Sequence, residues 1–211
     1  MNNNDEMFSR NTKHVELIRQ APETTKLSRG PKYLQEPFYE LSHQFWPDRD
    51  DLKKEAEYIR SVGKHKMVVP VIDEDYGKCV LEFQFSHDET PILNQYLNNF
   101  VERYGSFGRM IAHYFYIDEG MNYVWHRDNK PTSTTESFPV QCCVNVIVTD
   151  DGSECEFLGH GTYKYTAGVL NTSHLHRVTP VRNRILARIS FLDSIYEEVV
   201  HRIRKIDRRI T

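Results

Sequence analysis

The chain has 211 residues, of which 39% are apolar, so it can bury one sizeable core and nothing requires a second domain. A formal net charge of −3 argues against a general attraction to nucleic acid or to anionic membranes. The longest apolar runs are too short to span a bilayer, and four cysteines without a leader-like apolar run favour a reducing, cytoplasmic setting.

The first part of the chain is predicted to hold an arm, a docking segment and a helix. Residues 1–30 are mainly polar and predict a mobile arm, which leaves a single domain over 31–211. The segment 36–47 carries aromatic side chains that would dock on the core of that domain. Residues 48–62 are charged, with sparse apolar positions and few breakers, and predict a solvated helix.

A hairpin and a second helix are expected next. Residues 66–72 and 78–85 favour strands and flank an Asp-Tyr-Gly turn, which predicts the hairpin. Thr90 and Pro91 are typical of a helix start, and Gly105 of a helix end. Apolar side chains recur at helical spacing between them, so this helix should pack on a sheet.

The region from Arg109 to Leu192 changes to short β-favouring runs separated by turn signals such as Asp-Gly and Arg-Asn. Many short strands of this kind predict a mainly β sandwich or jelly roll, with packing helices before it. The segment 194–210 predicts one amphipathic C-terminal helix that packs on the domain or forms a homodimer with another subunit. The expected strands are 109–117, 122–127, 139–149, 154–158, 162–165, 168–172, 175–181 and 184–192.

The strongest chemical signal is His126 and Asp128, because residues two apart on a strand share one face. Their side chains would lie about 7 Å apart along the strand, close enough for one metal ion to take both. This is the only His-x-Asp sequence in the chain. A polar pair at a strand end is the alternative without a metal.

A third ligand and two arginines follow downstream. His174 and His176 share strand parity, and His176 is preferred because it opens a strand-like run that turns into residues 184–191. In that last run Arg184 and Arg188 share a face, and a buried guanidinium requires an anion. A dicarboxylate could supply it through a bidentate contact, whereas a solvated edge strand would leave both arginines exposed.

The sequence resembles the iron- and 2-oxoglutarate-dependent dioxygenases in the run 123–129 and in two residues downstream of it. His176 follows 48 positions after Asp128, and Arg184 follows eight positions after His176. The closest likeness is to the prolyl-hydroxylase-like branch, with a looser one to the aspartyl/asparaginyl hydroxylases, and it covers about 109–192. The resemblance implies Fe(II) ligands at His126, Asp128 and His176. It implies 2-oxoglutarate binding by Arg184 and by Tyr116, ten positions before the first ligand. Because the interval to Arg184 is slightly short for the family, Arg188 remains an alternative.

The resemblance further implies a double-stranded β-helix in a single oxygenase domain, with core about 109–192. It implies hydroxylation of an unactivated C–H bond in an amino acid or a peptide or protein side chain, with release of succinate and CO2. Ascorbate is a candidate stimulant. Trp125, Asn129 and Asn145 are candidates for contacts around the site, with ordinary strand roles as the alternative. The segments 38–46 and 130–137 would flank its mouth as lid or as connectors.

Other functions remain open on the sequence alone. A nucleobase oxygenase of the same superfamily is one, although the basic patch on the last helix is more typical of a solvated face. A metal-binding cupin and a non-catalytic jelly-roll binding protein are others, and neither has a need for the arginine after the distal histidine. The basic patch comprises Arg202, Arg204, Lys205, Arg208 and Arg209.

Overall fold

The structure is a computed structural model, and it describes residues 36–62, 66–68, 81–84, 89–117, 125–128, 142–149, 154–178 and 183–209. The predicted arm, Asn129 and the segment 130–137 lie outside these ranges. The described cysteines, Cys142, Cys143 and Cys155, are buried and free.

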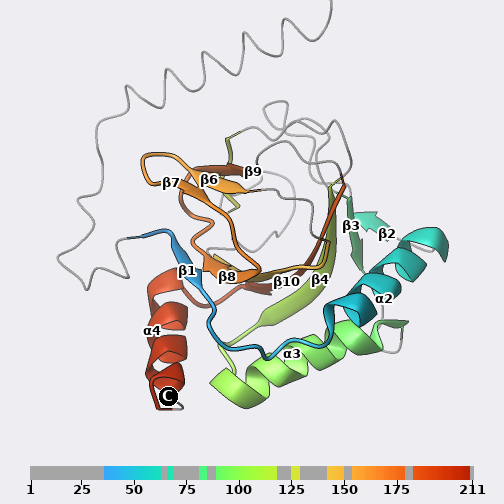
Figure 1. The fold of residues 1–211 in the computed structure, drawn as a ribbon, viewed down its shortest axis with the longest axis horizontal. Coiled ribbons are helices and arrows are strands. Elements are labelled where there is room, and N and C mark those ends of the chain that lie inside the picture. Colours follow the sequence, from blue (N-terminus) through green and yellow to red (C-terminus); the bar gives the residue numbers. More distant parts are fainter. Residues whose placement is uncertain are drawn as a thin grey trace, which may run out of the picture. The chain divides into compact units, whose positions relative to one another are not determined.

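Within the described ranges the strands form two antiparallel sheets. The larger sheet runs in the order β1-β8-β5-β10-β4-β3-β2, and the smaller in the order β7-β6-β9. From β5 onward the chain passes repeatedly between the sheets, so that β6, β7 and β9 face β5, β8 and β10 (Figure 1). The bounds are β1 Phe38–Glu40, β2 Lys66–Val68, β3 Leu81–Gln84, β4 Met110–Ile117, β5 Cys142–Ile147, β6 Cys155–Phe157, β7 Gly161–Tyr163, β8 Ala167–Leu170, β9 His176–Val178 and β10 Arg184–Phe191.

Three helices of the described chain cover the outer side of the larger sheet, away from the smaller one (Figure 1). They are α2 (Arg49–Val62), α3 (Pro91–Tyr104) and α4 (Tyr196–Asp207). The prediction of a mainly β chain is therefore corrected to a mixed architecture, because these helices are needed to bury the sheet's outer face. None of the described helices is long and apolar enough to cross a membrane.

The helix α2 is not merely solvated, as the sequence suggested, because one of its faces is fully buried. Leu52 and Ala56 on that face are 0% exposed, and the helix contacts α3 and β10. Its Glu55 carboxylate also accepts hydrogen bonds from the backbone nitrogens of Ile92 and Leu93, at 2.7 and 2.8 Å. A charged residue of α2 thus satisfies donors in the first turn of α3, where a negative charge is favoured.

The prediction that α3 packs on a sheet is confirmed. The Tyr96 hydroxyl is buried and donates to the backbone oxygen of Val144 in β5. The helix ends at Gly105, whose φ of 80° suits glycine and whose N–H bonds the carbonyl of Val101.

The strand β10 lies between β4 and β5, in the interior of the larger sheet. Its alternation is as predicted: Phe191 packs with the aromatic rings of the helix side, while Arg184 and Arg188 belong to the opposite face. Arg184 is 1% exposed, so the alternative of a solvated edge strand is wrong.

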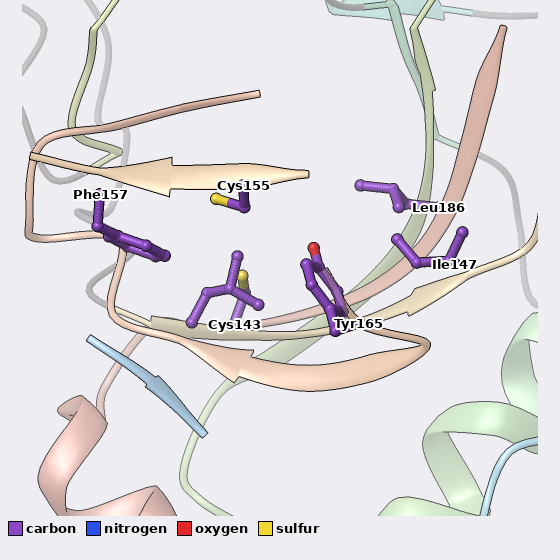
Figure 2. Packing of buried hydrophobic residues seen from close by; sticks show 7 residues of the cluster. Cys143, Ile147, Cys155, Phe157, Tyr165 and Leu186 are labelled. Carbon is purple, nitrogen blue, oxygen red and sulfur yellow. The ribbon is translucent and has the colours of Figure 1, made fainter. Parts of the chain in front are cut away.

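A cluster of buried side chains fills the space between the two sheets. Figure 2 shows Cys155 and Phe157 reaching in from β6, and Cys143, Ile147 and Leu186 from β5 and β10. The Tyr165 hydroxyl points into the same space (Figure 2). Burial on this scale fixes the sheet-to-sheet spacing, so polar groups that enter it are held in place.

The helix α4 packs on the rest of the chain through contacts with α3 and β8. Its residues Val199, Val200 and Ile203 are 0% exposed. These contacts bear out the packing alternative for its apolar side, and a homodimer through this helix stays a prediction.

Candidate metal and co-substrate site

The first and third predicted ligands are joined by their backbones. His126 and His176 form an antiparallel bridge, with N–H to oxygen distances of 3.0 Å in both directions. The backbone nitrogen of Asp128 donates to the carbonyl of Thr172 at 3.1 Å. In the described part of the predicted strand 122–127, the β-pairing is therefore limited to this one bridge to β9. The bridge places the two histidines next to one another.

The three predicted ligand side chains converge. One ligand atom each from His126, Asp128 and His176 lies within 4.8 Å of the others. Asp128 Oδ1 is 3.5 Å from Nε2 of His126 and 3.8 Å from Nε2 of His176. Among the described residues this is the one such group of His, Cys, Asp or Glu, and its composition is that of the two-histidine, one-carboxylate iron centres. Their role as iron ligands stays a prediction.

His174, the alternative third ligand, lies outside the group. Its ring packs against that of His160, with centroids 5.3 Å apart. Its contribution to the site is its backbone carbonyl, which lies 2.9 Å from Nδ1 of His176. Since a carbonyl can only accept, this contact places the His176 proton on Nδ1 and leaves Nε2 free to bind a metal.

The charge states also suit a metal. Burial, reinforced by the neighbouring His126, lowers the pKa of His176 to about 4, so its imidazole is neutral near pH 7. Burial works to raise the pKa of Asp128, but Arg188 and the two imidazoles outweigh burial and hold this pKa well below its ordinary value. A neutral imidazole at His176 and an ionised carboxylate at Asp128 are protonation states that suit the binding of a divalent cation.

Arg184 is a buried cation with unused donors. Its Nη2 donates to the hydroxyl of Tyr165 at 3.2 Å. Its Nε and Nη1 have no hydrogen-bond acceptor among the described residues, although both atoms are shielded from solvent. A buried donor without a hydrogen bond costs about 1–3 kcal/mol of stability, and a charged donor costs more. An anion that accepts from both nitrogens would remove that cost.

Tyr165 extends this donor group. Its oxygen accepts from Arg184 and from Nδ2 of Asn145, the latter at 3.3 Å. Neither bond uses the hydroxyl proton, which is therefore left for a third group. Burial raises the pKa of Tyr165 to about 12, so that proton is retained at neutral pH.

Arg188 serves a different partner. Its Nη2 donates to Oδ2 of Asp128 in a partly buried ion pair, and its guanidinium lies 4.9 Å from the ring centroid of Phe115. The two arginines of β10 thus differ in their surroundings: Arg188 meets a carboxylate, whereas Arg184 meets a hydroxyl.

The prediction that Tyr116 reaches the co-substrate is not supported. Tyr116 pairs with Ile185 in the register, so it occupies the face of β4 opposite to that of Arg184. Its hydroxyl donates to the carbonyl of Ala56 in α2 at 2.7 Å. Sequence reasoning missed Tyr165, which lies between β7 and β8, because no fixed spacing links it to a ligand.

Trp125 directly precedes the first predicted ligand and is partly buried. The guanidinium of Arg177 stacks 4.7 Å from its ring centroid and also bonds Glu156 through Nε at 2.7 Å. Trp125 and Arg177 each neighbour a predicted ligand, so this contact joins the two ligand segments a second time. That is a supporting role, in line with the alternative held for Trp125.

The fold and this three-residue group define a double-stranded β-helix with a candidate metal centre. The same fold occurs in a viral collagen prolyl hydroxylase from Paramecium bursaria Chlorella virus-1, solved as a 2OG complex. The match has a TM-score of 0.50 and 11% sequence identity, and it covers 74% of this chain and 94% of that one. At this identity the likeness establishes the fold alone.

Two further structures show weaker similarity. A Pseudomonas putida prolyl-4-hydroxylase matches with a TM-score of 0.48 and 14% identity, over 75% of this chain and 94% of that one. An oxidoreductase of the 2OG-Fe(II) oxygenase family from Burkholderia pseudomallei matches with a TM-score of 0.44 and 13% identity, over 75% and 88%. No family model matches the sequence, and no curated protein does.

Proposed function

We propose that the protein is an Fe(II)- and 2-oxoglutarate-dependent oxygenase. The observation that carries the proposal is the combination, between the same two sheets, of a His-Asp-His group and a buried arginine with two unused donors. Either feature by itself is compatible with a purely structural role. Together they suit two linked ligands: the His-Asp-His group would bind a metal, and the arginine would bind the far carboxylate of an oxoacid that chelates this metal.

The residues fit the metal. Nε2 of His176, Oδ1 of Asp128 and an imidazole nitrogen of His126 would hold Fe(II) on one face. Fe(II) held there together with 2-oxoglutarate would activate O2 for the oxidation of an unactivated C–H bond. The chain's own contribution is to fix the three donors in place and to keep His176 neutral and Asp128 ionised.

The residues also fit the co-substrate. Nε and Nη1 of Arg184 and the hydroxyl proton of Tyr165 provide three donors for one carboxylate. This favours Arg184 over Arg188, because the latter is already paired with Asp128. Asn145 holds the Tyr165 oxygen from the other side and so orients the proton.

The reaction consumes one molecule each of 2-oxoglutarate, O2 and substrate R–H, and it forms succinate, CO2 and R–OH. One oxygen atom enters succinate and the other enters the product. For R–H we propose a carbon of an amino acid or of a peptide or protein side chain. The support is analogy with the viral structure of the same fold, whose name specifies a collagen prolyl hydroxylase.

The competing functions explain less of the site. A metal-binding cupin or a non-catalytic jelly roll has no use for the unused donors of Arg184. A nucleobase oxygenase would gain from a basic surface on α4, but Arg202 is engaged within the chain, with the carbonyl of Ser106 and the ring of Phe107. No described contact favours that substrate.

The test is turnover. The purified protein, supplied with Fe(II), ascorbate and 2-oxoglutarate, should release succinate, faster when candidate amino acids or peptides are added. Arg184→Met should abolish this release while keeping the metal. Succinate release that persists unchanged in Asp128→Ala would show that the activity does not arise at this site.

A further inference from the structure

Arg188 lies where it can control how Asp128 meets a metal. It belongs to β10, its register partners are His113 in β4 and Asn145 in β5, and its side chain is 11% exposed. The ring of Phe115 covers the guanidinium, whose Nη2 donates to Asp128. A partly buried, charge-assisted bond of this kind is stronger and more directional than a neutral one.

The two oxygens of Asp128 have different partners. Oδ1 faces the Nε2 atoms of His126 and His176, at 3.5 and 3.8 Å. Oδ2 accepts from Arg188. Only one carboxylate oxygen is therefore directed at the point where the three ligands meet.

We propose that Arg188 is a positioning residue that keeps Asp128 a one-oxygen ligand and thereby preserves an open position on the metal. This rests on the proposed function. Carboxylates bind metals through one oxygen or through both, and here the number matters. Three protein atoms and two from 2-oxoglutarate leave one of six positions for O2. A second oxygen from Asp128 would fill it.

A merely structural arginine would behave differently. If Arg188 only filled space or balanced charge, its replacement would weaken folding or metal binding in general. If it holds Oδ2, its replacement leaves the metal and 2-oxoglutarate bound and closes the last position. Arg184 is a matched control, because it is a buried arginine on the same face of the same strand, four residues earlier.

Nitric oxide is the probe for the last position. Wild-type protein, Arg188→Met, Arg188→Lys and Arg184→Met are loaded anaerobically with Fe(II) and 2-oxoglutarate. Nitric oxide is then titrated, with the electron paramagnetic resonance signal of iron nitrosyl as readout. Retention of iron and of 2-oxoglutarate is measured in the same samples, and circular dichroism reports folding.

We expect Arg188→Met to keep iron and 2-oxoglutarate and to bind nitric oxide about tenfold or more weakly than wild type, the usual scale for groups that orient metal ligands. Arg188→Lys, which retains one donor, should restore most of the binding. Arg184→Met should show the opposite pattern, with 2-oxoglutarate lost and nitric oxide still bound.

Wild-type nitric oxide affinity in Arg188→Met would overturn the proposal, and so would loss of the iron itself. If Arg188→Met does not fold, Arg188→Gln takes its place, with the same two outcomes. Failure of the proposed function is distinguishable, because it would appear in the wild-type protein as iron without 2-oxoglutarate binding.

Discussion

The Tyr165 hydroxyl accepts a hydrogen bond from Nη2 of Arg184 at 3.2 Å, in the space between the two sheets. Arg184 is 1% exposed and Tyr165 is 8% exposed, so this is a polar contact inside an otherwise apolar cluster. Both groups retain unused donors, and the proposed function assigns these donors to a carboxylate of 2-oxoglutarate.

Tyr165→Phe should weaken 2-oxoglutarate binding by about three- to tenfold, because it removes one hydrogen bond worth about 0.5–1.5 kcal/mol. Iron binding should be unchanged. The measurement is calorimetric titration of the iron-loaded protein under anaerobic conditions. Tyr163→Phe is the control, because the Tyr163 hydroxyl bonds Glu36 instead. An equal loss in both variants would mean that the effect is one of packing.

Alanine substitutions of His174 and His176 should differ in their effect on metal binding. His176→Ala should abolish metal binding, because it removes a nitrogen from the group of three. His174→Ala should retain the metal to within about threefold, since its contact with His176 uses the backbone carbonyl, which alanine keeps. Co(II) titration followed by visible absorption measures both. Retention of Co(II) by His176→Ala together with its loss in His174→Ala would reverse the assignment.

Gly168→Ala should destabilise the domain by about 1–3 kcal/mol, the usual cost of overpacking. An added Cβ would lie 2.7 Å from Cζ of the Phe38 ring, which itself packs on the ring of Tyr165. Urea unfolding followed by circular dichroism gives the free energy. Phe38→Leu in the same chain should recover part of the loss, and strict additivity of the two changes would argue against a clash between them.

The pair formed by Arg109 and Asp193 should make stability depend on acid pH. It joins the segment before β4 to that after β10, with an Nη2–Oδ1 distance of 2.6 Å. Hydrogen bonds from Arg109 lower the pKa of Asp193 from 3.8 to about 2. A carboxyl group whose pKa is lowered by folding stabilises the folded state at pH values above its pKa in the unfolded state. This stabilisation is lost as the pH falls through its pKa in the folded state.

Asp193→Asn should therefore be less stable than wild type near neutral pH, and the difference should shrink as the pH falls from about 4 towards 2. Thermal melts across this range measure it, and added salt should reduce the difference because the pair is exposed. A difference that stays constant with pH would show that the carboxylate charge plays no part.

The alternation of β10 and the course of α3 were predictable because their side chains repeat with the period of the element. The alternation from Arg184 to Phe191 and the start at Pro91 depend on neighbours in the sequence. The strand β1 was not anticipated. Its residues Phe38–Glu40 pair with Leu170, Val169 and Gly168, and that pairing depends on a contact more than a hundred positions away.

The site residues likewise fall into those that the sequence could predict and those that it could not. His126 and Asp128 could be named because a short motif fixes their spacing, and His176 because it opens a strand-like run. The structure brings the three together. Tyr116 was chosen by a family spacing, but the pairing with Ile185 turns it towards α2. Tyr165 could not be found, since its position near Arg184 arises from the stacking of one sheet on the other.

The most direct test of the account is whether 2-oxoglutarate binds to the wild-type protein in a manner that depends on the metal. Calorimetry of the anaerobic Fe(II)-loaded protein should give one 2-oxoglutarate site per chain. Binding of 2-oxoglutarate should be much weaker without iron and absent in Arg184→Met. Absence of 2-oxoglutarate binding to folded, iron-loaded wild-type protein would contradict the account.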